Sequence, residues 1–249
     1  MHEIFPSMNS KPAAIKVFAL IPWSLWIYIL FPFYLLPLIG AGLWENPEHS
    51  VWLQIGNHVL SALPLLFLLW SYLREEWSMV AMDGRYYLKH IALTVVLIVG
   101  VELWLFSMLK LGGVDTASMR EGLPVAEMLV SQTPYYLIRL EPLWGTVVMS
   151  VFVPISICAL FYCFAFSPVC CRNTWLAYLS VAVVALIPTA VNILWENCDA
   201  SLGLNMYLAS LPVHFLACWS YQKTDNVWTP LLSLSLANLL ISLLQIFIK

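Results

Sequence analysis

The side chains that could move a proton in this sequence are few, and they lie apart from one another. Glu102, His58 and His214 each fall within an apolar run of about 20 residues. A carboxylic acid and two imidazoles on separate helices could form an acid–base site or a metal site if they converged. Because burying such groups at membrane depth is costly, each is a candidate functional residue.

A structural role is the alternative for each of these residues, and also for Asn192 and Asn238. Polar side chains between membrane helices commonly make one interhelical hydrogen bond that holds the packing together. No two of Glu102, His58 and His214 stand four residues apart on one helix, so the sequence contains no local metal-binding motif. The six cysteines show no CxxC spacing, and we interpret them as small buried hydrophobic residues.

Arg74-Glu75-Glu76 is the one pair of adjacent glutamates, and it follows an apolar run. Paired glutamates activate the nucleophile in one class of membrane protease, whose motif continues with an arginine four residues later. That position is Val80 here. We therefore predict that the Arg74–Glu76 segment is a solvated helix face.

The composition determines what kind of molecule carries these residues. The chain has 249 residues, of which 61% are hydrophobic and 10% are charged, and its mean hydropathy is +0.84. Soluble domains carry about 25% charged residues, so these values predict a single integral membrane domain over 1–249, with the lipid bilayer as its first partner. The net charge of −3 gives no basic footprint for nucleic acid.

The predicted fold class is all-α, a multi-pass bundle of transmembrane helices. Seven apolar runs are long enough to span a bilayer: 17–43, 51–72, 88–109, 144–166, 174–195, 204–221 and 228–247. The most polar connection is 110–142, and its middle, 124–140, is mildly apolar. We interpret 124–140 as an interfacial or re-entrant helix; if it spans the bilayer, the bundle has eight spans.

The distribution of basic residues predicts the orientation of the bundle. With the N-terminus inside, the cytoplasmic segments hold seven basic residues: Lys11, Lys16, Arg74, Arg85, Lys89, Arg172 and Lys223. The outer segments hold four: Lys110, Arg120, Arg139 and Lys249. This asymmetry favours a cytoplasmic N-terminus. We expect a multi-pass protein of a bacterial inner (plasma) membrane.

The closing hairpin carries the most specific pattern. Its turn reads Tyr221-Gln-Lys-Thr-Asp-Asn-Val-Trp-Thr-Pro230, with a polar stretch at 222–227, and Asn238 follows on the next helix. This order resembles the end of the CPBP family (CAAX-protease and bacteriocin-processing, or Abi) of intramembrane proteases. Members of that family close with a Tyr-x-Lys-Thr-Gly-Ser-Leu-Trp-Ala-Pro type turn and a helix carrying His-x-x-x-Asn.

Two upstream stretches are similar to the same family in the same order. Val153-Pro-Ile-Ser156 is similar to the Ala-Pro-Ile-Ala stretch before the family's Glu-Glu-x-x-x-Arg motif. Ser180-Val-Ala-Val183 is similar to the run before its Phe-x-x-x-His motif. The resemblance covers about 144–247, and it leaves an N-terminal three-helix part at about 15–110.

The chain departs from the family at almost every catalytic position. The residues at those positions are Ile157 and Cys158 for the two glutamates, Tyr162 for the arginine, Val184 and Pro188 for the phenylalanine and histidine, and Leu234 for the last histidine. Only Asn238 is retained. In the family the glutamate activates water while the histidines and asparagine support it, and general acid–base catalysis needs such titratable groups. Cys158 could be a residual nucleophile, but the sequence supplies no base beside it.

Three hypotheses for function follow from these observations. The first is a pseudoprotease, shaped like a CPBP protease, that binds a membrane protein or peptide partner. The second is an active intramembrane endopeptidase with a rebuilt site of Glu102, His58 and His214. The third is a small-molecule carrier, which the absence of internal repeats and the scarcity of charged membrane residues disfavour. None of the three calls for a cofactor or a bound metal.

Overall fold

The computed structural model describes residues 47–111, 138, 141–159, 165–170, 173–195 and 200–247, and all regular structure in these segments is helical. The elements are α3 (Pro47–Met82), α4 (Gly84–Leu111), α8 (Pro142–Val147), the π-helix η2 (Val148–Phe152), α9 (Val153–Ile157), α10 (Ser167–Cys170), α11 (Thr174–Trp195), α12 (Ala200–Thr224) and α13 (Trp228–Phe247). The all-α class is therefore confirmed for this part of the chain. The predicted run 17–43 and the segment 124–140, apart from Ile138, lie outside the described residues.

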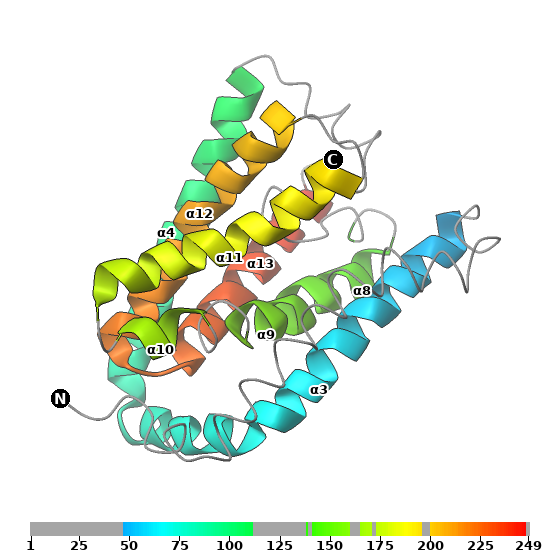
Figure 1. Cartoon of the computed structure of the whole chain (residues 1–249). Helices are drawn as coiled ribbons and strands as arrows, with labels where there is room; N and C mark the ends of the chain where they lie inside the picture. The colour runs from blue at the N-terminus through cyan, green and yellow to red at the C-terminus, as the bar shows by residue number, and fades with distance from the viewer. Residues whose placement is uncertain are drawn as a thin grey trace.

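Three helices form the centre of the bundle. Helices α4, α12 and α13 pack against one another, and α11 packs along α12. The row α8–η2–α9 lies against α13, and α3 runs along the outer side of that row (Figure 1). As a result α3 and α12 lie on different sides of α13 (Figure 1).

The helices extend further than the apolar runs predict. Helices α3 and α4 are separated by Asp83 alone, whose side chain accepts the main-chain N–H of Tyr86 at 3.4 Å. We predicted a connection over 73–87, but this stretch contains good helix formers and only one glycine, so the helix continues past its apolar part. Similarly, α12 continues to Thr224, which shortens the predicted turn 222–227 to three residues.

The fourth predicted run is irregular near Pro154. The chain widens into the π-helix η2 immediately before this proline, and Val153 donates its N–H to the carbonyl of Val148, five residues back. Proline has no N–H and cannot continue either hydrogen-bonding pattern. A π-bulge is a usual way for a helix to absorb such an interruption.

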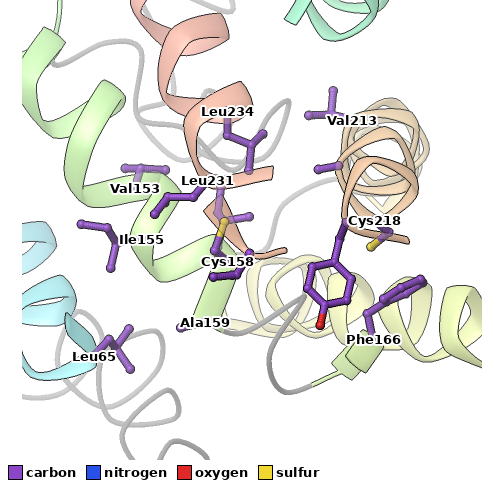
Figure 2. Packing of buried hydrophobic residues seen from close by; sticks show 14 of the residues in the cluster. Leu65, Val153, Ile155, Cys158, Ala159, Phe166, Val213, Cys218, Leu231 and Leu234 are labelled. Carbon is purple, nitrogen blue, oxygen red and sulfur yellow. The ribbon is translucent and has the colours of Figure 1, made fainter. Parts of the chain in front are cut away.

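One apolar cluster links the helices, and a large part of the outer surface is also apolar. The cluster draws side chains from α3, α4, α9, α11, α12 and α13. Figure 2 labels members from α3, α9, α12 and α13. Within the described segments, one stretch, Gly84–Trp104, has the length and apolar character needed to cross a membrane, and 28% of its most apolar window is buried. Shorter apolar helical stretches occur in α3, α11 and α13 and over Pro142–Ile157.

Candidate functional site

Three of the positions that the resemblance marks as catalytic lie in the same apolar cluster. Ile157 and Cys158, at the end of α9, are buried, and so is Leu234 on α13, which is 2% exposed. Figure 2 shows Cys158 and Leu234 among the cluster side chains, with Val213 of α12. Hydrocarbon and one thiol therefore stand where the resemblance places proton-handling groups.

The structure describes the positions of the Phe-x-x-x-His motif only in part. Val184 is half-buried on α11 and packs against the cluster. Pro188 belongs to α11, but its side chain lies outside the described part of the structure, as does the whole of Tyr162. The structure thus brings Ile157, Cys158, Leu234 and Val184 to one apolar core.

Asn238, the one residue that agrees with the catalytic motifs of the resemblance, has a specific partner. Its side-chain amide is buried and donates a hydrogen bond to the main-chain carbonyl of Met149 in η2 at 2.9 Å. In this widened turn the N–H of Val153 is committed to Val148, and Pro154 has none to offer. Both main-chain donors within reach of the Met149 carbonyl are therefore lost, and Asn238 supplies the missing donor from another helix.

The three residues of the rebuilt-site hypothesis lie on three different helices. His58 is half-buried on α3, Glu102 is half-buried on α4, and His214 is buried on α12. Helices α4 and α12 run antiparallel, because Tyr86 at the start of α4 donates its O–H to the carbonyl of Lys223 near the end of α12 at 2.8 Å. At 1.5 Å per residue from this contact, Glu102 lies about 10 Å further along the bundle axis than His214.

The histidine on α3 belongs to a different packing surface. Helix α3 packs mainly on η2 and α9 and makes smaller contacts with α13 and α4, whereas α12 packs on α4, α11 and α13. Within the described segments, no group of three His, Cys, Asp or Glu side chains is arranged to hold a metal ion. Of the described cysteines, Cys158 and Cys218 are buried and Cys170 is half-buried, and none of the three forms a disulfide.

The turn between α12 and α13 is bonded to the end of α3. Asn226 donates its side-chain N–H to the carbonyl of Glu76 at 2.9 Å, and Val227 donates its main-chain N–H to Oε2 of Glu76 at 3.3 Å. Trp228 donates its indole N–H to the carbonyl of Leu73 at 2.7 Å. We call the contact made by Glu76, Asn226, Val227 and Trp228 the turn latch.

Each motif position in this turn has a physical task. Asp225 has a φ of +49°, and it takes the place where the family turn has glycine, the residue that adopts this conformation without strain. Asn226 accepts the main-chain N–H of Trp228 at 2.9 Å and so caps the start of α13. Pro230 lies in the first turn of α13, where its missing N–H costs nothing.

The prediction of a solvated face over Arg74–Glu76 is wrong for Glu76. Arg74 and Glu75 are exposed, but Glu76 is only 7% exposed because the turn covers it. The pKa of Glu76 is raised to about 7: burial is the largest cause, the charges of Asp225 and Glu75 act in the same direction, and the hydrogen bond from Val227 opposes them. A carboxyl group that titrates near neutral pH therefore lies at the joint between α3 and the turn.

The sequence indicates the turn side of this latch but not the Glu76 side. An Asn two residues before Trp-Thr-Pro is a recognisable helix cap. Nothing local to Glu76 indicates burial, since its neighbour Glu75 is exposed and its covering residues lie about 150 positions away in the chain.

Comparison with known proteins adds no relative to these observations. A scan against protein-family models finds no match, and neither the curated proteins nor the solved structures contain a match to this chain.

Proposed function

We propose that this chain is a multi-pass membrane protein with a CPBP-like closing hairpin that acts as a pseudoprotease. It binds a membrane-embedded or peptide partner and does not hydrolyse it. The observation that carries the proposal is the burial of Ile157, Cys158 and Leu234 in one apolar cluster. Aliphatic side chains at the positions of a general base and its supporting histidine cannot accept or donate a proton.

The outer surface supports a bilayer environment for this bundle. Large apolar side chains face outward on several helices, including Phe67 on α3, Val96 on α4 and Trp175 on α11, which are 82%, 67% and 84% exposed. Soluble monomers rarely display apolar patches on this scale. We propose the seven-span arrangement, with the N-terminus and the turn latch on the cytoplasmic side, as the topology that places these faces in lipid.

The turn supports the family resemblance through its backbone. Asp225 adopts a left-handed conformation where the family pattern has glycine, and Asn226 caps a helix where that pattern has serine. These requirements depend on backbone geometry and hydrogen bonding. A chain that lost catalysis would still need them to close the hairpin.

The rebuilt-site hypothesis has less support. Glu102 and His214 differ by about 10 Å along the bundle axis, whereas direct proton transfer needs hydrogen-bond distance. His58 lies on α3, which packs mainly on η2 and α9.

The test uses the full chain in liposomes with a panel of fluorescent apolar and prenylated peptides. We expect saturable binding of at least one peptide and no cleavage product by mass spectrometry. Glu102→Gln and Cys158→Ala serve as matched variants, and both should bind like the wild type. Cleavage that either variant abolishes would overturn the pseudoprotease, and an absence of saturable binding across the panel would overturn the binding function.

A further inference from the structure

The turn latch joins two parts of the chain that are far apart in sequence. The carboxyl group of Glu76 accepts the Val227 N–H, and the carbonyl of the same residue accepts the Asn226 side chain. The indole of Trp228 packs edge-to-face on Trp77, with ring centroids 4.9 Å apart. Thus one turn of α3 holds the start of α13 by hydrogen bonds and by aromatic contact.

The charges around Glu76 are mainly of the same sign as its own. Asp225 faces it from the turn and Glu75 from its own helix, while the phenol of Tyr87 faces it from the start of α4. Both carboxylates disfavour the ionised form of Glu76, and burial does so more strongly. The Val227 N–H is a single neutral donor and offsets only part of this penalty.

We propose that Glu76 makes the turn latch proton-sensitive: protonation holds the α12–α13 turn on α3, and ionisation loosens it. When the turn leaves α3, Glu76 reaches water and regains an ordinary acidity. Because the open form binds fewer protons than the closed form, acidification favours the closed latch. The device is independent of the proposed binding function.

The pH range of this response follows from the two states of Glu76. Its pKa is about 7 in the closed latch and returns toward the ordinary value of 4.5 when the turn is open. The open population therefore rises between about pH 4.5 and pH 7 and is constant above that range. The full change in the open-to-closed ratio is on the order of 100-fold.

Amide hydrogen exchange of the full chain in detergent, followed by mass spectrometry, measures the opening directly. The readout is the peptide that contains Val227 and Trp228, in the wild type and in Glu76→Gln, which keeps an acceptor oxygen without the charge. Comparison at the same pH removes the intrinsic pH dependence of exchange. We expect equal rates at pH 4.5, and at pH 8 a wild-type rate higher by up to about 100-fold.

Two further variants make the result specific. Glu75→Gln removes the smaller of the two neighbouring charges, so it should keep most of the wild-type rise and move it only slightly to lower pH. Asp225→Asn should reduce the rise and move it to lower pH, since Asp225 disfavours ionised Glu76. The amide exchange rate of peptides from α11 is the control, because it rises only if the whole protein opens. A wild-type to Glu76→Gln ratio that stays the same at both pH values would overturn the latch, and so would a Glu75→Gln protein that behaves like Glu76→Gln.

Discussion

The side-chain amide of Asn238 on α13 donates to the main-chain carbonyl of Met149 in the π-helix η2 at 2.9 Å. This bond satisfies an acceptor that lost its main-chain donor because residue 154 is a proline. In a bilayer, such carbonyls must find partners on neighbouring helices, since water is absent. The residue that the family resemblance marks as part of a catalytic site therefore has a structural task here.

This relationship predicts coupling between Asn238 and Pro154. Asn238→Ala should destabilise the protein by about 1–3 kcal/mol, because it leaves a buried carbonyl without a donor. In a Pro154→Ala background the restored N–H can serve the same region of η2, so the same substitution should have a smaller effect. Denaturant unfolding of the four proteins in detergent gives the coupling energy. Additive effects of the two substitutions would contradict the account of η2.

The indole of Trp228 predicts a second, smaller effect. Trp228→Phe keeps an aromatic ring against Trp77 but removes the donor to the Leu73 carbonyl. We expect a loss of about 1 kcal/mol in the free energy of unfolding. Trp175→Phe, at an exposed position on α11, is the control and should change stability little. Equal losses of unfolding free energy at the two sites would show that the indole N–H of Trp228 adds no specific stability.

The backbone of Asp225 predicts a stabilising substitution. Asp225→Gly should increase the free energy of unfolding by up to about 1 kcal/mol, because glycine adopts a φ of +49° without strain. Asp225→Asn removes the same charge but keeps a side chain, so it separates the electrostatic part from the conformational part. Thermal unfolding of both proteins checks this prediction, which fails if Asp225→Gly is less stable than Asp225→Asn.

The buried carboxyl of Glu76 predicts how global stability depends on pH. Its folded pKa, about 7, lies above the ordinary value of 4.5, so folding favours the protonated form. The contribution of Glu76 is fully present below about pH 4.5 and is lost as pH rises to about 7. The loss is on the order of 3 kcal/mol. The difference in unfolding free energy between the wild type and Glu76→Gln, measured from pH 4.5 to pH 8, isolates this residue from other titrating groups. A flat difference would show that Glu76 is solvated.

Helix content and several helix ends could be predicted because they depend on neighbouring residues. The run 174–195 matches α11, and Trp228-Thr-Pro230 begins α13 as predicted. The ends of α3 and α12 could not be predicted from hydropathy, because those helices continue through polar residues with good helix propensity. Hydropathy measures how long a segment is apolar, whereas a helix ends where its hydrogen bonds lose their donors or acceptors.

By itself, the sequence determined a strongly apolar chain whose described segments are helical, a turn with the residues that a tight connection needs, and the absence of a carboxyl or imidazole group at Ile157, Cys158 and Leu234. These properties follow from residue type and local spacing. Only the tertiary structure decided that Glu76 is buried while Glu75 is not, and that Asn238 serves the Met149 carbonyl. Both depend on which distant segment covers a residue, and the contacts join positions about 90 and 150 residues apart.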